Sequence, residues 1–186
     1  MKICRFALLL VLPLLGMRKC EREVAPTFTL PPATQTGANT FGFVLDGRVW
    51  RNYGWLPYTA AESDNLSSSY VPHGRFTLNA GLIDRNRYER FYLFLDSLVN
   101  TGTYRANANV ASGATRRAER ILIFSGESDK LYYGYSPNGT KTNVTITKLD
   151  TVKHIIAGTF EGAVAQRVDS TKQVRITDGR FDIKYQ

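Results

Sequence analysis

The stretch that decides the fold is Phe41-Gly-Phe-Val-Leu-Asp-Gly-Arg-Val-Trp50. Apolar residues alternate with other residues on both sides of an Asp-Gly dipeptide, a pair that strongly favours a two-residue β-hairpin turn. Such a turn sets the register of the two strands, so that Phe43 faces Trp50 and Val44 faces Val49. The stretch therefore predicts an antiparallel hairpin at the start of a strand-rich body.

A second hairpin is predicted at Asn138-Gly139, between the segments 131–136 and 142–148. Asn-Gly favours the same tight turn as Asp-Gly, because both residues tolerate a positive φ. The register that this turn would impose brings apolar side chains together: Tyr133 with Val144 and Leu131 with Ile146.

A third hairpin is predicted at Asp178-Gly179, joining the segments 174–176 and 181–185. Its register would again pair apolar side chains: Ile176 with Phe181 and Val174 with Ile183. The opposite face would then carry the charged residues Arg175, Arg180, Asp182 and Lys184. We accordingly expect Asp182 to lie on a solvated face of the sheet.

Further strands are predicted from alternating apolar residues at 75–83, 103–107, 120–125 and 154–165. The segment 88–99 also fits a helical stripe, but the aromatic run from Phe91 to Leu95 favours a strand that continues to Asp96. About ten strands at this spacing predict an all-β fold. We expect residues 40–186 to form a single antiparallel β-sandwich or a flattened barrel.

The N-terminus has the features of an export signal. Lys2 and Arg5 precede an apolar stretch of 12 residues, from Phe6 to Met17. A membrane-spanning helix needs about 20 apolar residues, so this stretch is too short to span. We predict that residues 1–20 form a signal peptide and that the protein is exported.

Cys20 is a candidate for lipid attachment. The sequence Cys20-Glu-Arg-Glu is similar to the start of mature bacterial lipoproteins, whereas Met17-Arg18-Lys19 departs from the small residues that usually precede the cysteine. Cleavage at another position and an uncleaved weak anchor remain the alternatives. Residues 21–39 are rich in Pro and Thr and predict an extended tether that would display the β domain.

Composition argues against several classes of function. Four of the 24 basic residues precede Cys20, so a mature chain starting there would carry 20 basic and 16 acidic residues. This small excess is spread along the chain, whereas nucleic-acid binding proteins usually carry a denser basic stripe. Both cysteines of the chain, Cys4 and Cys20, lie before the predicted body. That body can therefore form no disulfide or thiolate metal site, and two histidines are too few for a His-rich metal site. We expect neither a metal nor another cofactor.

Two parts of the chain stand out: Leu30–Trp50, and Ile155–Gly162 together with Ile176–Tyr185. They resemble an uncharacterised family of exported, mostly lipid-anchored β-rich lipoproteins from Bacteroidetes-type bacteria. The resemblance implies a bacterial envelope protein located in the periplasm, on the outer membrane or at the cell surface. It implies a domain of unknown function and carries over no catalytic residues.

No catalytic motif is present, neither a nucleophile elbow, a zinc-protease helix, a phosphate-binding loop nor a calcium loop. His73 lies in a turn and His154 at a strand start, where a surface role is the simpler interpretation. A glycosidase needs only two facing carboxylates. The candidates for such a pair are Glu161, Asp178 and Asp182, although Asp178 is better explained as a turn residue. We therefore assign no catalytic residue.

The most suggestive cluster is aromatic. Trp50, Tyr53, Trp55 and Tyr58 fall within nine positions and include both tryptophans of the chain. We expect Trp50 to lie in the core opposite Phe43. Exposed aromatic rings stack on sugar rings, so Trp55, Tyr58 and Tyr53 form a candidate ligand-binding platform. The alternative is that they close one end of the core, and Tyr132 and Tyr135 are weaker candidates for binding.

Two functions of different class follow. The first is a non-catalytic envelope domain that is structural or binds a ligand, with a glycan or an envelope protein as its partner. The second is a carbohydrate-binding or glycan-active module that uses the Trp55 region. Exposure of the Trp55 and Tyr58 rings would separate the two.

Overall fold

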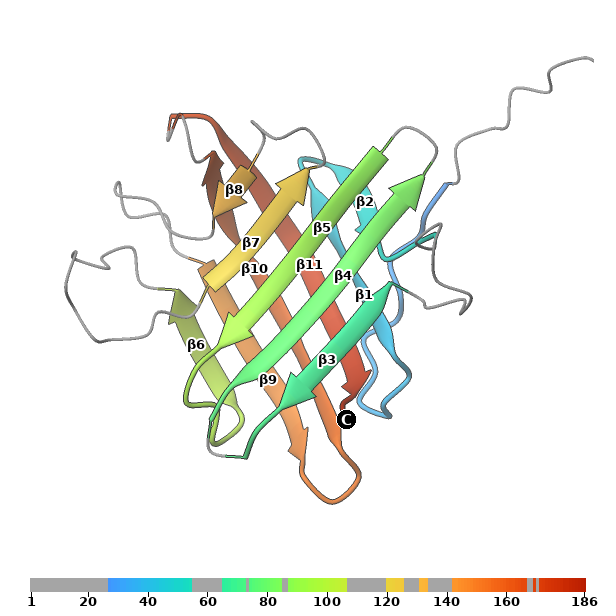
Figure 1. The fold of residues 1–186 in the computed structure, drawn as a ribbon, viewed down its shortest axis with the longest axis vertical. Helices are drawn as coiled ribbons and strands as arrows, with labels where there is room; N and C mark the ends of the chain where they lie inside the picture. The colour runs from blue at the N-terminus through green and yellow to red at the C-terminus, as the bar shows by residue number, and fades with distance from the viewer. Residues whose placement is uncertain are drawn as a thin grey trace, which may run out of the picture.

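The computed structural model describes residues 27–54, 65–72, 74–84, 87–106, 120–125, 131–133, 142–166, 169 and 171–186. Within these ranges the chain forms eleven β-strands and no helix. Figure 1 shows how the strands are arranged. No helix long and apolar enough to cross a membrane occurs among these residues. The all-β prediction is confirmed.

The strands lie in two layers that cross each other in Figure 1. The front layer contains, in spatial order, β3 (Leu66–Tyr70), β4 (Phe76–Asp84), β5 (Arg87–Leu95), β7 (Arg120–Ser125) and β8 (Leu131–Tyr133). The back layer contains β2 (Arg48–Arg51), β1 (Thr40–Leu45), β11 (Gln173–Lys184), β10 (Ile155–Gln166), β9 (Thr142–Asp150) and β6 (Gly102–Ala106). All these strand pairs are antiparallel. Strand β8 also pairs with the end of β10 and so joins the layers, which do not close into a barrel.

The first hairpin has the predicted geometry. Asp46 and Gly47 have φ values of 47° and 82°, as a two-residue hairpin turn requires. Phe43 pairs with Trp50, and Val44 pairs with Val49. The Asp-Gly dipeptide therefore sets this register, and it places the rings of Phe43 and Trp50 in the core.

The predicted hairpin at Asp178-Gly179 is wrong, because β11 continues through both residues. Asp178 has a φ of 54°, and the pairing of β11 shifts by one residue here relative to both β10 and β1. The dipeptide is thus a β-bulge. A Cβ at position 179 would lie 2.6 Å from the Phe160 ring, so the close approach of Phe160 favours glycine. Like a two-residue turn, a one-residue bulge keeps Ile176 and Phe181 on one face, and both are buried.

The predicted pairing of 131–136 with 142–148 is also wrong. Both edges of β9 are occupied by other strands, β10 on one side and β6 on the other. Strand β8 pairs instead with β7 and with Ala165–Gln166 at the end of β10. The dipeptide Asn138-Gly139 lies outside the described residues.

The core lies between the two layers and is rich in aromatic rings. Phe41 and Phe43 of β1 face Phe91 of β5 and Phe160 of β10, with ring centroids 4.9–5.7 Å apart. Aromatic pairs at this spacing add favourable edge and offset contacts to the burial of apolar area. The segment that also fitted a helical stripe is strand β5, as predicted, and its residues Phe91, Leu93 and Leu95 alternate into the core.

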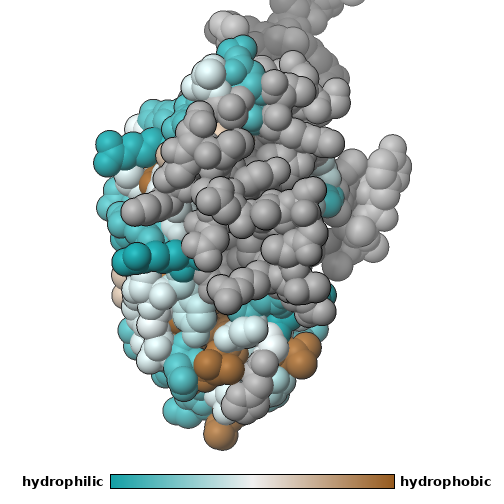
Figure 2. Space-filling model, turned by 90° about the vertical axis from the view of Figure 1, so that its left-hand side faces the viewer, coloured by the Kyte–Doolittle hydropathy of each residue, from teal (hydrophilic) through white to brown (hydrophobic). Residues whose placement is uncertain are grey.

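Exposed large apolar residues are few in the described part of the chain. They are Tyr53, Val71, Val99 and Val152. In Figure 2 the hydrophobic colour gathers toward the lower end of the molecule, and the remaining described surface in this view is mainly hydrophilic.

Candidate functional site

The aromatic residues singled out in the sequence do not form one site in the described structure. Trp50 is fully buried, and its indole N–H donates a hydrogen bond of 2.7 Å to Glu89. The Glu89 carboxylate also accepts from the Arg48 guanidinium at 3.1 Å, so Arg48 neutralises the negative charge of Glu89. Tyr53 is 44% exposed and packs against the Phe28 ring. Trp55, Tyr58 and Tyr135 lie outside the described residues, as does the side chain of Tyr132.

The expectation that Asp182 lies on a solvated face is wrong. Its side chain is 1% exposed, because residues 31–39, which we call the N-terminal strap, cover it. Oδ2 accepts hydrogen bonds from the Thr34 hydroxyl (2.6 Å), both the amide (2.8 Å) and hydroxyl (3.2 Å) of Thr36, and the Ala38 amide (3.3 Å). Oδ1 accepts from the Gly37 amide at 2.7 Å. Asp182 is therefore unavailable as one member of a catalytic carboxylate pair.

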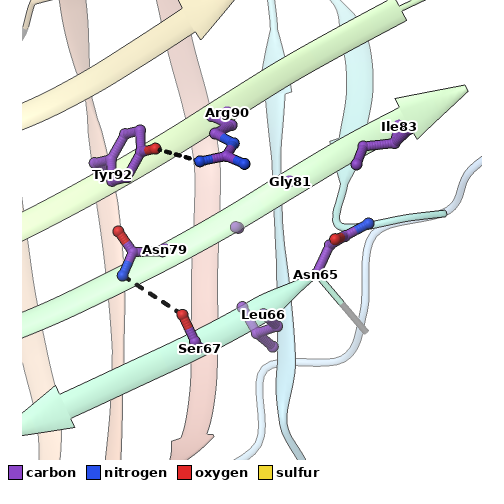
Figure 3. A pocket seen from close by; sticks show the side chains of 9 residues that line it. Asn65, Leu66, Ser67, Asn79, Gly81, Ile83, Arg90 and Tyr92 are labelled. Atoms are coloured by element: carbon purple, nitrogen blue, oxygen red, sulfur yellow. Dashed lines mark hydrogen bonds between the residues drawn. The ribbon is translucent and has the colours of Figure 1, made fainter. Parts of the chain in front are cut away.

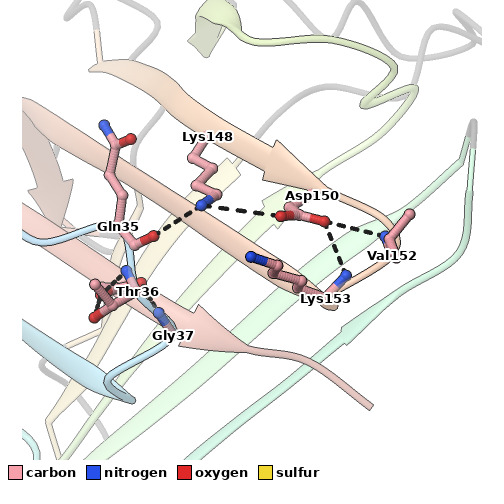
Figure 4. A network of polar contacts seen from close by, with 8 residues as sticks. Gln35, Thr36, Gly37, Lys148, Asp150, Val152 and Lys153 are labelled. Atoms are coloured by element: carbon pink, nitrogen blue, oxygen red, sulfur yellow. Dashed lines mark hydrogen bonds and ion pairs between the residues drawn. The ribbon is translucent and has the colours of Figure 1, made fainter.

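Other contacts hold the strap on the back layer. Asn39 accepts a hydrogen bond of 2.8 Å from the Lys184 amide, and the Arg180 guanidinium donates to the Pro31 carbonyl at 3.4 Å. Figure 4 shows that the Lys148 ammonium lies between the Gln35 carbonyl (3.1 Å) and Asp150 (3.9 Å). The described part of the predicted tether, residues 27–39, has no helix or strand and contacts the β domain.

The remaining candidates that the structure describes show no catalytic arrangement. Glu161 and Asp178 are exposed on the back layer, and Asp178 belongs to the bulge of β11. The His154 ring stacks on Tyr185 at 5.1 Å, which gives it a packing partner. His73 lies outside the described residues. No group of three His, Cys, Asp or Glu side chains that could hold a metal ion occurs in the described part of the chain.

A depression on the outer face of the front layer is the strongest candidate site. Alternation along each strand directs one set of side chains outward, and the register places them in cross-strand rows. Asn79 of β4 lies between Ser67 of β3 and Tyr92 of β5. In the next row, Gly81 pairs with Arg90 and lies beside Asn65. Figure 3 shows these three strands side by side, with these residues around the depression.

The hollow exists because Gly81 has no side chain. A Cβ at this position would lie 3.3 Å from the Cβ of Asn65 and would start to fill the gap between Asn65 and Arg90. The hollow has a volume of about 440 Å³. Glycine within a strand weakens the strand, and it often marks a place where a ligand or another chain segment approaches closely.

Polar groups around the hollow are partly fixed by the protein. The Arg90 guanidinium donates a hydrogen bond of 3.1 Å to the Tyr92 hydroxyl and lies 5.0 Å from the centre of the Tyr88 ring. The hydrogen bond to Tyr92 raises the pKa of Arg90 above the ordinary value of arginine, so this side chain stays charged. The Asn79 amide lies 3.5 Å from the Ser67 hydroxyl. The lining is completed by Asn65, Leu66, Ala80, Gly81 and Ile83.

One of the predicted site residues, Tyr53, adjoins this hollow through its backbone. Its amide donates to the Gly81 carbonyl at 3.0 Å, and its carbonyl accepts from the Ile83 amide at 2.9 Å. The Asn65 side chain donates to the carbonyls of Tyr53 and Gly54. Tyr53 therefore lies along the rim of the hollow.

Sequence reasoning missed the residues that line this hollow. The usable signal is the alternation Tyr88, Arg90, Tyr92 and Phe94, which occupies the positions between the buried residues of β5. Once β5 is taken as a strand, its outer face carries aromatic rings around a single arginine. Gly81 and Asn79 contribute to the hollow through the register of β4 with β5, which could not be predicted from the sequence.

Comparisons with known proteins offer no analogue. No protein-family model, no curated protein and no solved structure matches the chain.

Proposed function

We propose that this protein is an exported, envelope-associated β domain that binds a saccharide without cleaving it. The observation that carries the proposal is the hollow at Gly81, where a tyrosine ring, a guanidinium, two amides and a hydroxyl converge. Sugar-binding sites combine an aromatic face, on which the apolar side of a sugar ring stacks, with groups that bond its hydroxyls. Tyr92 supplies the ring, and Asn79, Asn65 and Ser67 supply such groups.

The residues that line the hollow support binding without hydrolysis. Glycosidases use two carboxylates on either side of the scissile bond. The residues that line the hollow include no Asp, Glu or His. Asp182, one of the carboxylates considered from the sequence, is enclosed by the N-terminal strap on the other layer.

Export and anchoring form part of the same proposal. Residues 1–20 have the features of a signal peptide, and Cys20 is the proposed site of lipid attachment. A location on the bacterial envelope is part of this proposal, because an exported chain with a lipid on Cys20 would be held at a membrane surface. Labelling cells with radioactive palmitate is expected to mark the wild type and not Cys20→Ser, and an unlabelled wild type would end the lipoprotein proposal.

A glycan array probed with the full chain, purified in mild detergent, tests the binding function. Tyr92→Ala is expected to weaken binding by about fivefold or more, taking as a guide the stacking of a nucleic-acid base on an aromatic side chain, which contributes on the order of 1–3 kcal/mol. Gly81→Val is expected to abolish binding by filling the hollow. Thr77→Ala is the control, since Thr77 lies outward on the same strand outside the hollow.

The same array separates the hollow from the aromatic cluster predicted around Trp55. If Trp55→Ala loses binding while Tyr92→Ala retains it, the site lies at the Trp55 cluster. If no glycan binds, the binding proposal fails and a structural role becomes the better explanation.

A further inference from the structure

We infer that the ligand of the Gly81 hollow is an acidic saccharide whose carboxylate is bound by Arg90. This inference rests on the proposed function and specifies its ligand. It follows from the charge balance of the site, from the orientation of the guanidinium and from the groups beside it.

The charge balance distinguishes Arg90 from the described cations that form ion pairs. Arg48 contacts Glu89 at 3.1 Å, Arg75 lies 3.8 Å from Asp96, and Lys148 lies 3.9 Å from Asp150. By contrast, no described carboxylate forms an ion pair with Arg90, and none lines the hollow. Arg90 is thus the one charged side chain in the described lining of the hollow, and an anionic ligand would neutralise it.

The orientation of the guanidinium suits a carboxylate. Its Nη1 atom donates to the Tyr92 hydroxyl, and the Tyr88 ring covers the group at 5.0 Å. These two contacts hold the planar group in one place while leaving other N–H donors of the fork for a ligand. Figure 3 shows the guanidinium extending from β5 toward β4 near Gly81. Arginine binds carboxylates through paired N–H groups, and a preoriented fork loses little entropy on binding.

The groups around Arg90 favour a sugar over a simple anion. Asn79 and Ser67 lie one row away on the neighbouring strands, and Asn65 lies across Gly81. Amides and hydroxyls of this kind bond the ring hydroxyls that an inorganic anion lacks. A hollow of about 440 Å³ lies within the size range of small-ligand sites. A uronic or sialic acid unit carries both the carboxylate and the hydroxyls.

Paired oligosaccharides provide the test. The full chain is titrated by calorimetry with galacturonic acid and sialic acid oligosaccharides and with the methyl ester of each, which removes the charge and keeps the ring. We expect the acid forms to bind at least tenfold more tightly than their esters. Arg90→Gln is expected to lower the affinity for the acid form to that of its ester, and Arg90→Lys to retain part of the preference.

Arg75→Gln is the matched control. Arg75 lies on the same layer and is also 5.0 Å from an aromatic ring, that of Phe94, but it contacts Asp96 and does not line the hollow. This variant is expected to keep the full preference for acid forms. Circular dichroism spectra of all variants establish that each is folded before titration.

Each outcome decides between the inference and the proposed function. Equal affinity for acid and ester, both lost in Gly81→Val, overturns the acidic ligand and leaves saccharide binding intact. A preference for the acid that persists in Arg90→Gln overturns the role of Arg90. Binding of no oligosaccharide overturns both proposals.

Discussion

Two charged residues on opposite layers, Asp182 and Arg90, show how differently this fold uses a charge on the outer face of a sheet. Asp182 is 1% exposed, and its carboxylate accepts five hydrogen bonds from residues 34–38. Arg90 is partly exposed, donates one hydrogen bond to Tyr92 and lines an open hollow. The first charge is saturated by its own chain, whereas the second keeps hydrogen-bonding capacity toward solvent.

This difference separates a folding role from a binding role. A buried carboxylate is stable only when donors replace its lost water, so Asp182 and the N-terminal strap depend on each other. A preoriented cation beside a hollow contributes little to folding but is ready to receive an anion. Variants at the two positions should therefore have opposite effects on stability and on binding.

The largest effect on stability is expected for Asp182→Asn. Asparagine places an NH₂ group where one carboxylate oxygen accepted hydrogen bonds, so buried donors of the strap lose their acceptor. We expect the free energy of unfolding to fall by about 2–4 kcal/mol, measured by urea denaturation. Asp178→Asn is the control, because that residue is exposed and asparagine tolerates its positive φ. A loss below about 0.5 kcal/mol for Asp182→Asn would show that the strap contributes little to folding.

The pH dependence of stability should report the same contact. Burial raises the pKa of Asp182, but the hydrogen bonds from residues 34–38 outweigh burial and hold its pKa below the ordinary aspartate value. A lowered pKa in the folded state stabilises the protein above the unfolded pKa of about 3.9, and this stabilisation is lost as the pH falls toward the folded pKa. The difference in urea midpoint between wild type and Asp182→Asn should therefore shrink below about pH 4. A difference that stays constant down to about pH 2.5 would contradict the assignment.

Most of the burial pattern could be predicted from the sequence, because period-two alternation reports which face of a strand is apolar. Phe43 and Trp50, and the inward residues of β4, lie in the core as expected. Alternation also predicted the burial of Ile176 and Phe181, although the prediction assumed a hairpin turn at Asp178-Gly179 that the structure does not have. A two-residue turn and a one-residue bulge at Asp178-Gly179 leave the same residues facing the core. Which of the two forms depends on β1 and β10, which occupy both edges of β11.

The candidate site could be predicted only in part, because it depends on contacts between distant segments. Alternation placed Asp182 on an outer face but could not show that residues 34–38 cover that face. The hollow requires the register that sets Gly81 beside Arg90 and Asn79 beside Tyr92. Among the described residues, Tyr53 at its rim connects the aromatic cluster noted in the sequence with the site in the structure.

An intermediate effect on stability is expected for Glu89→Gln. Glu89 lies on the core side of β5, where its carboxylate accepts from the Trp50 indole and the Arg48 guanidinium. Glutamine keeps one acceptor but loses the ion pair, so the free energy of unfolding should fall by about 1–2 kcal/mol in urea denaturation. Glu161→Gln, at an exposed position of β10, should change it by less than about 0.5 kcal/mol. An equal loss in both variants would mean that Glu89 has no specific role in the core.

The smallest effect on stability is expected for Arg90→Gln, the variant with the largest expected effect on acid preference. Its guanidinium forms one hydrogen bond and one ring contact, both at a partly exposed position. A contact of an exposed cation with an aromatic ring contributes about 0.5–1 kcal/mol, so the free energy of unfolding should fall by no more than about 1 kcal/mol. Urea denaturation without ligand measures this change. A loss as large as that of Asp182→Asn would place Arg90 among the residues that hold the fold together, because a charge kept free for a ligand cannot also carry much of the folding free energy.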